Sequence, residues 1–254
     1  MKKIGILCAG DTELAAFLPY VKETEVIEKA MLVFHCGNID RVEVVLLYSG
    51  VCKVNAAIAA QLLIDCFAVD CIINAGTAGG IQEQVQLFDT VISERIAYHD
   101  VADDILTEFH PWMDSVYFYA DENLLQSAKA YSNTTKRVIL FGTMVSGEQF
   151  VTEENREQIL TGFTPLCTDM ETAAVAHVCY VNKLPFLAIR TITDTAEHKG
   201  IGEFEKNCAA ASAISAEIVC ALLPSFCGQL HNGYPNFLGV FARNLGVNFG
   251  GEKK

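Results

Sequence analysis

Basic residues are scarce in this sequence and never clustered. The 254 residues include 18 Lys and Arg against 31 Asp and Glu, a formal net charge of −13, and no basic run exceeds two residues. Binding to nucleic acid needs a positive field, so this balance argues against a general affinity for phosphate backbones. No stretch reaches the roughly 18 uninterrupted apolar residues typical of a transmembrane helix. We therefore expect neither a nucleic-acid partner nor a membrane span.

The ten cysteines include no C-x-x-C pair, and most lie inside apolar segments, where a free thiol behaves as a small hydrophobe. Disulfide scaffolds are typical of short secreted chains, and zinc sites need clustered ligands. The apolar run before Asp11 is only about six residues long, too short for a secretion signal. We therefore expect free thiols in the cytoplasm. Because His99 and His177 are isolated, we expect no metal and no cofactor.

Short apolar runs rich in β-branched residues alternate with amphipathic segments. This alternation predicts a single three-layer α/β domain, residues 1–224, around a mixed and partly curled sheet flanked by helices. Residues 225–254 are rich in Gly and Asn without a sustained period, which favours a disordered tail or an appendage over an apolar patch. Strands are expected at 3–9, 42–48, 71–74, 89–98, 137–141 and 186–192, and helices at 53–66, 122–130, 153–160, 171–180 and 203–223.

Polar residues gather where expected strands end, which is where ligands bind in open α/β sheets. Each segment has an ordinary explanation when taken alone: helix capping by Asp11 or Glu171, a glycine turn, or a core position for Phe150. Asp194 is more unusual, because a carboxyl group at the end of an apolar strand is costly unless it is bonded or protonated. The set predicts a site. Its segments are 8–14, 74–80, 144–151 and 168–174, together with 190–194.

Seven blocks between about Lys2 and Leu223 resemble, in order, the purine nucleoside phosphorylase and nucleosidase superfamily. The closest resemblance is to the 5′-methylthioadenosine/S-adenosylhomocysteine nucleosidases. Any single block would be weak evidence, but seven in the family order are specific. The blocks are I-G-I-x-x-A followed by Glu13, S-G-V-C-K-V at 49–54, N-A-G-T-A-G-G at 74–80, Y-H-D at 98–100, V-S-G-E-Q-F at 145–150, D-M-E-T-A-A-V-A-H-V-C at 169–179 and R-T-I-T-D at 190–194.

The resemblance implies hydrolysis of an N-ribosidic bond in 5′-thio-substituted adenosines. Glu13 would deprotonate the attacking water, and Asp194, held by Thr193, would protonate adenine N7. It also implies a homodimer in which residues within 103–112 cover the partner's 5′ pocket. The implied substrate-binding residues are Val51, Thr77, Ala78 and Gly79, then Phe150 and Val151 for the purine, and Asp169, Met170, Glu171 and Thr193.

Departures from the family pattern fall mostly around the 5′ substituent. Gly10 stands where a Met often lines that pocket, and Asp169 where Glu is common, while Thr77 and Thr193 replace the usual Ser. The loop after residue 100 aligns poorly. Both carboxylates of the implied chemistry are present.

The main open question is whether the nucleophile is water or phosphate, because phosphorylases share this fold. Phosphate needs Arg or Lys donors, and in related phosphorylases these follow the first turn and precede the glycine loop. Here Glu13 and Asn74 occupy those regions. We therefore expect a cation-poor pocket that uses water. A phosphate-dependent phosphorylase, a nucleosidase for another adenine nucleoside such as aminodeoxyfutalosine, and a silent nucleoside-binding protein remain alternatives.

Overall fold

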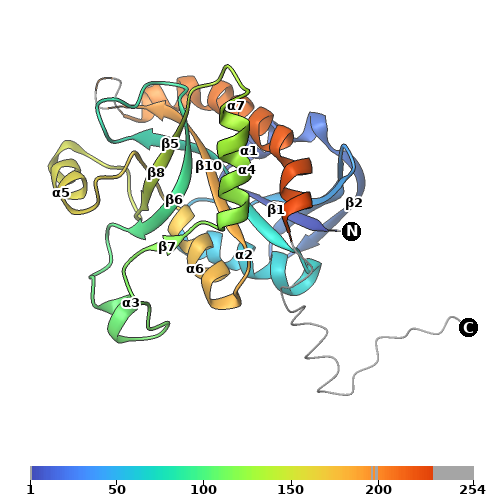
Figure 1. The fold of residues 1–254 in the computed structure, drawn as a ribbon, viewed down its shortest axis with the longest axis horizontal. Helices are drawn as coiled ribbons and strands as arrows, with labels where there is room; N and C mark the ends of the chain where they lie inside the picture. Colours follow the sequence, from blue (N-terminus) through green and yellow to red (C-terminus); the bar gives the residue numbers. More distant parts are fainter. Residues whose placement is uncertain (1, 196, 198–199, 231–254) are drawn as a thin grey trace, which may run out of the picture.

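The structure, a computed structural model, describes residues 2–195, 197 and 200–230 of the chain (Figure 1). Strands and helices alternate along most of it. The strands are β1 (Lys3–Cys8), β2 (Lys22–Lys29), β3 (Leu32–Ile39), β4 (Val42–Tyr48), β5 (Cys71–Gly80), β6 (Thr90–Tyr98), β7 (Phe118–Tyr119), β8 (Ile139–Ser146), β9 (Cys167–Asp169) and β10 (Phe186–Asp194). The helices are α1 (Asp11–Ala15), α2 (Lys53–Phe67), α3 (Ile105–Glu108), α4 (Glu122–Ser132), α5 (Glu153–Phe163), α6 (Thr172–Asn182) and α7 (Ile201–Gln229), with a 3₁₀ turn at Leu18–Tyr20.

All ten strands belong to one mixed sheet, and part of that sheet closes on itself. The open part runs in the order β5-β1-β4-β3-β2. In the curled part, β10 pairs with both β5 and β6, β6 pairs with β8, and β9 bridges β8 back to β5. The prediction of a mixed, partly curled sheet is confirmed. The closure brings the carboxyl end of β10 beside that of β5.

Two helical layers cover the sheet (Figure 1). Helices α2 and α6 pack on one face, and α1, α4 and α7 pack on the other. Successive residues of a buried strand face opposite layers: in β1, Ile6 packs toward α7 and Leu7 toward α2. Helix α7 is long and apolar enough to cross a membrane by length and composition, but more than half of its most apolar window is buried inside the protein. Such burial is typical of a core helix.

Several elements differ from the expected ones, and the strand expected at 137–141 runs on to Ser146 as β8. The strand expected at 71–74 continues through the glycine segment to Gly80, because β10 and β9 supply hydrogen-bonding partners on its two edges. The hairpin of β2 and β3 and the short β9 were not expected, since edge strands such as β2 carry little apolar pattern. Helix α7 runs through Pro224 to Gln229, into the segment expected to be a tail. The remaining tail residues, 231–254, lie outside the described residues.

Candidate active site

A cavity of about 740 Å³ opens at the carboxyl ends of β1, β5, β9 and β10. The closure of the sheet explains its position, because loops from both halves of the chain meet there. The twelve residues expected from the sequence to form the site all line this one cavity. They are Glu13, Val51, Thr77, Ala78, Gly79, Phe150, Val151, Asp169, Met170, Glu171, Thr193 and Asp194.

Glu13 lies in the first turn of α1 and is only 4% exposed. Its Oε2 atom accepts hydrogen bonds from the backbone N–H groups of Ala9 (2.7 Å) and Gly10 (3.2 Å). Its Oε1 atom accepts from the N–H (2.7 Å) and the hydroxyl (2.8 Å) of Thr77. Both oxygens of the carboxyl group therefore act as acceptors. Three backbone N–H groups and one hydroxyl of the protein therefore surround the carboxyl group of Glu13.

Asp194 ends β10 at a register shift opposite Gly79. The hydroxyl of Thr193 donates to its Oδ1 atom at 2.8 Å. Burial raises the pKa of Asp194, and the Thr193 hydrogen bond lowers that pKa by a smaller amount. The environment thus favours the protonated carboxylic acid more than water does. Asp194 faces the same cavity as Glu13, across the segment of β5 that contains Thr77 and Gly79.

Glu171 precedes α6 and is 4% exposed. Its Oε1 atom accepts from the N–H of Cys52 at 2.8 Å. Cys52 holds a left-handed backbone with φ of 81°, an unfavourable conformation for a residue with a side chain, and this aims its N–H at the carboxylate. Burial raises the pKa of Glu171 to about 7, although nearby Arg190 lowers it. Glu171 therefore changes its protonation state near neutral pH.

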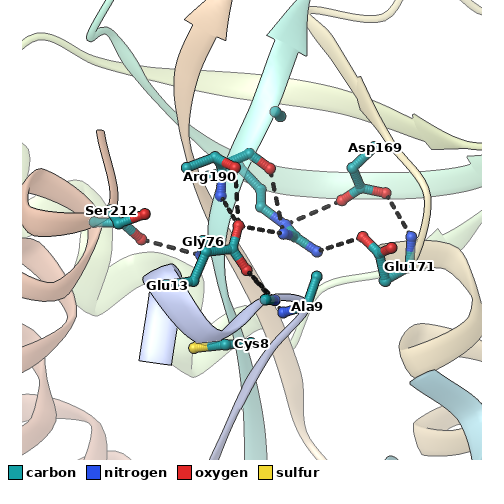
Figure 2. Close-up of polar contacts among 12 residues, drawn as sticks. Cys8, Ala9, Glu13, Gly76, Asp169, Glu171, Arg190 and Ser212 are labelled. Atoms are coloured by element: carbon teal, nitrogen blue, oxygen red, sulfur yellow. Dashed lines mark hydrogen bonds and ion pairs between the residues drawn. The ribbon is translucent and has the colours of Figure 1, made fainter. Parts of the chain in front are cut away.

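Arg190 is the charged residue of the site to which the sequence analysis gave no role. It is fully buried within β10, and its guanidinium lies between Glu13 on one side and Asp169 and Glu171 on the other (Figure 2). The nitrogen–oxygen separations are 3.7 Å to Glu13, 3.0 Å to Asp169 and 3.7 Å to Glu171. Burial works to lower the pKa of Arg190, but the three carboxylates raise that pKa by more. The sequence did contain a sign of this role, because an arginine within an apolar strand must be paired with acidic or polar groups.

The expectation of a cation-poor pocket is wrong, because Arg190 and Arg156 both line the cavity. Both guanidinium groups nevertheless donate hydrogen bonds to other groups of the protein. Arg190 donates to the Thr172 hydroxyl, the Thr77 carbonyl and the Asn74 side-chain carbonyl, in addition to its ion pairs. Arg156 donates to the carbonyl of Ile81. Three acidic side chains therefore surround the guanidinium of Arg190.

Asp169 lies in the cavity wall, but its oxygens are used within the protein. Oδ1 accepts from the hydroxyl of Ser146 (2.5 Å) and from the N–H groups of Glu171 (3.2 Å) and Thr172 (3.0 Å). Oδ2 contacts Arg190 and the Thr172 hydroxyl. These contacts fix the start of α6 and the position of Glu171. Asp169 therefore lines the cavity and also holds the start of α6 in place.

Phe150 and Phe204 form an aromatic pair in the cavity wall. Phe150 is 43% exposed, so it is not a core residue. Its ring meets that of Phe204 edge to face, with centroids 5.9 Å apart and an interplanar angle of 78°. Phe204 lies on α7 and also lines the cavity, together with Cys208 one turn later. Sequence reasoning missed both, because an apolar residue on an apolar helix gives no sign of which cavity it faces.

The segment 103–112, expected to cover a partner's site, lies outside the cavity of its own chain. It contains α3 and two strongly exposed aromatic residues, Phe109 (59%) and Trp112 (66%). His177 contacts the Tyr98 hydroxyl at 3.3 Å and stacks on Phe118, as expected of a structural histidine. Among the described residues, no group of three or more His, Cys, Asp or Glu side chains is arranged to hold a metal ion.

The sequence of residues 3–224 matches the family model of the phosphorylase superfamily. The chain belongs to this superfamily. A 5′-methylthioadenosine/S-adenosylhomocysteine nucleosidase of Staphylococcus saprophyticus is 37% identical over 226 residues, which cover 87% of this chain and 98% of that protein. The superfamily match and the nucleosidase relatives identify the chain as an N-glycosyl hydrolase.

Two solved structures of this superfamily have the same fold. The 5′-methylthioadenosine/S-adenosylhomocysteine nucleosidase of S. pneumoniae, with a transition-state inhibitor, superposes with a TM-score of 0.80 at 31% identity, covering 88% of this chain and 99% of that one. The futalosine hydrolase of Helicobacter pylori superposes with a TM-score of 0.81 at 27% identity, covering 88% and 97%. The nucleoside phosphorylase-like fold expected from the sequence is confirmed.

Proposed function

We propose that this chain hydrolyses the N-ribosidic bond of 5′-thio-substituted adenosines such as methylthioadenosine and S-adenosylhomocysteine, releasing adenine and a thioribose. One observation carries the proposal. Glu13, held as an acceptor, and Asp194, held in surroundings that favour its protonated form, face one cavity across the same segment of β5. An acid and a base opposed in this way suit a hydrolysis in which the acid protonates the leaving group while the base activates the attacking water.

Asp194 is the proposed general acid. As the bond breaks, its electron pair goes to the purine, and the proton of Asp194 passes to N7, so that neutral adenine leaves. The raised pKa of Asp194 keeps a proton available for this step. The Thr193 hydroxyl, which also donates to the Ala78 carbonyl at 3.3 Å, orients the carboxyl group.

Glu13 is the proposed general base. A water molecule attacks C1′ and gives a proton to Glu13, so that hydroxide adds to the sugar. The Thr77 hydroxyl now donates to Oε1 of Glu13, but a hydroxyl both donates and accepts. By rotating, it frees a lone pair of Oε1 for the water. The Arg190 guanidinium lies 3.7 Å from Oε1.

The ionic surroundings favour water over phosphate. Arg190 is already shared by Glu13, Asp169 and Glu171, and its nitrogens donate within the protein. A phosphate dianion beside these carboxylates would be repelled, at a cost of about a kcal/mol or more at partly buried separations. A neutral water molecule meets no such barrier.

The rest of the cavity fits a nucleoside. Glu171 lines the cavity and is proposed to bind the ribose hydroxyls, with Met170 packed on the sugar. Phe150 is proposed to stack on the purine, and the backbone of Val151 to bond its edge. Gly79 leaves bare backbone beside Asp194, where a flat ring can approach.

Adenine release from a nucleoside panel, with and without inorganic phosphate, tests this function. We expect turnover of methylthioadenosine and S-adenosylhomocysteine that does not depend on phosphate, with free thioribose as the sugar product. Turnover that requires phosphate and yields a sugar 1-phosphate would establish the phosphorylase alternative. Binding of the nucleosides without release of adenine would establish the silent binding protein.

A nucleosidase for aminodeoxyfutalosine is the second candidate. It is supported by the likeness to the futalosine hydrolase of H. pylori, whose TM-score of 0.81 equals that of several nucleosidases. The same panel, extended with aminodeoxyfutalosine, separates the two. We expect a larger kcat/KM for the 5′-thio substrates.

A homodimer is also proposed, with the segment 103–112 over the partner's cavity. The exposed rings of Phe109 and Trp112 on this segment support an apolar contact. Light scattering on the purified chain is expected to give twice the monomer mass. Trp112→Ala is expected to weaken the dimer, and a native monomer of full activity would contradict the arrangement.

A further inference from the structure

Thr193 is an extra residue at the carboxyl end of β10, where the register with β5 shifts. Ile192 lies opposite Ala78 in this register. The next pair joins Asp194 to Gly79, so Thr193 has no opposite residue on β5 and forms a β-bulge. A bulge bends its strand and changes the direction of a neighbouring side chain. The direction of the Asp194 carboxyl group therefore depends on how Thr193 is held.

Helix α7 holds this bulge through the side chain of Asn207. The Nδ2 atom of Asn207 donates a hydrogen bond to the Thr193 carbonyl at 2.9 Å. Asn207 is buried, with 6% of its surface exposed. A buried carbonyl without a donor is unfavourable, and a bulge takes its residue out of the regular ladder. Asn207 therefore supplies a fixed donor at the point where the strand pairing is interrupted.

The direction of the Asn207 amide is determined by its acceptors. A carbonyl oxygen only accepts, so the NH₂ group of Asn207 faces Thr193. The same nitrogen reaches Oε2 of Glu203, one turn earlier on α7, at 3.4 Å. Two neighbours on the helix, Phe204 and Cys208, line the cavity, whereas Asn207 lies outside the cavity lining. Asn207 therefore acts on the site through Thr193 and not by touching a ligand.

The packing of α7 gives no other reason for an asparagine at this position. The buried positions that follow on the helix are mostly small or apolar, such as Ala211 and Ala216. A buried amide among such residues costs free energy unless it is hydrogen-bonded. Ser215, two turns later, also binds β10, and its hydroxyl donates to the Ile189 carbonyl at 3.2 Å. Side chains of α7 thus fix β10 at two points, one of which is the bulge.

We propose that Asn207 is a positioning residue for the general acid, holding the Thr193 bulge so that Asp194 points at N7 of the purine. This inference rests on the proposed function and adds to it a residue that does not touch the substrate. The contacts run from Asn207 to the Thr193 carbonyl, and from the Thr193 hydroxyl to Oδ1 of Asp194. Their loss is expected to affect proton transfer, which needs a precise distance, more than substrate binding.

Steady-state kinetics with methylthioadenosine separate proton transfer from binding. Asn207→Ala is expected to lower kcat roughly tenfold, since small displacements of a reacting group are costly, and to change KM by less than about twofold. Asn207→Ser, which keeps a hydroxyl donor on a shorter side chain, is expected to lose less activity. An unchanged kcat in both variants overturns the inference.

A double-mutant cycle tests whether Asn207 acts through Asp194. In the Asp194→Asn background, Asn207→Ala is expected to change the remaining rate by less than about twofold, because no acidic proton is left to position. Release of radiolabelled adenine over long incubations measures these low rates. An equal loss from Asn207→Ala in the native and the Asp194→Asn backgrounds would show a general structural effect and overturn the inference.

Two control variants separate positioning from loss of stability. Asn182→Ala removes a matched contact on α6, outside the cavity, where Nδ2 donates to the Val178 carbonyl at 2.8 Å. Glu203→Ala removes the other acceptor of Asn207 and leaves the contact with Thr193. Both controls are expected to keep the native kcat, and urea unfolding compares their stability with that of Asn207→Ala.

The controls and the native chain distinguish the possible failures. A loss of kcat in Asn182→Ala equal to that in Asn207→Ala would attribute the effect to stability and overturn the inference. The proposed function fails separately: a native chain that releases no adenine, or an Asp194→Asn variant with a near-native rate, overturns the assignment of Asp194 as the acid and not only that of Asn207.

Discussion

Glu13 occupies its position because residue 76 has no side chain. A Cβ at Gly76 would lie 2.3 Å from Oε1 and 2.4 Å from Cδ of Glu13, far inside van der Waals contact. Gly76 also has φ of 155°, a conformation that residues with a Cβ rarely adopt. The glycine segment of β5 thus makes room for the carboxylate of Glu13 on α1.

Gly76→Ala is therefore expected to displace the Glu13 carboxylate and to lower kcat about 100-fold or more, as misplacement of a reacting group does. Adenine release measures the loss, and the far-ultraviolet circular dichroism spectrum reports whether the fold is kept. Gly162→Ala, whose added Cβ meets open space, is the control. Activity of Gly76→Ala within a few-fold of native would contradict the dependence of Glu13 on this glycine.

Glu13→Gln is expected to abolish hydrolysis while the fold is retained. The amide cannot take a proton from water, and its NH₂ group would face N–H donors of Ala9, Gly10 or Thr77. This mismatch is expected to cost about 1–3 kcal/mol of stability. Adenine release and urea unfolding measure the two effects. Glu157→Gln, at an exposed position on α5 outside the cavity, is the control. Activity of Glu13→Gln within a few-fold of native would refute its role as base.

Asp194→Asn is expected to keep substrate binding and to lose most turnover, because an amide can bond N7 without delivering a proton. Calorimetric Kd values for methylthioadenosine and the rate of adenine release separate binding from chemistry. Since burial raises the pKa of Asp194, kcat/KM of the native chain is expected to fall as pH rises through that pKa. A near-normal rate in the variant, or no alkaline fall, would contradict the acid assignment.

As pH rises and Glu171 ionises, the stability of the fold is expected to fall and the activity to rise. Its pKa is raised from the usual 4.5 to about 7, so the folded state binds this proton more tightly than the unfolded chain. Its contribution to stability is therefore complete below pH about 4.5 and is lost as pH rises to about 7, by roughly 3 kcal/mol. Ionisation over the same range improves its binding of the ribose hydroxyls.

Glu171→Gln is accordingly expected to raise the free energy of unfolding at pH 8 relative to the native chain while it lowers kcat/KM. Urea unfolding at pH 5 and pH 8 measures the first effect, and the pH profile of adenine release measures the second. Asp194→Asn serves as the comparison, because it removes a different buried carboxyl group. A native chain and variant with the same pH dependence of stability would show that Glu171 is not the group responsible.

That the twelve candidate residues share one cavity was predictable, because they lie where strands end. Glu13, Thr77 and Asp194 each follow or finish an apolar run, and parallel strands bring such ends to one edge of a sheet. The continuation of β5 through Gly80 was not predictable, because its pairing with β9 and β10 joins residues far apart in the sequence. The β2–β3 hairpin was missed for a different reason, since an edge strand such as β2 needs little apolar pattern.

The sequence by itself determined the alternation of apolar runs and helices, the excess of acidic residues, and the presence of Glu13, Glu171 and Asp194 at the ends of expected elements. Only the tertiary structure decided how these charges are balanced. Arg190 lies inside β10, and its contacts with Glu13, Asp169 and Glu171 exist because the sheet closes β10 against β5. The local sequence pattern predicts where polar residues interrupt or end apolar segments. The pairing of distant strands decides which of them meet in the low dielectric of the interior, where an uncompensated charge is most costly.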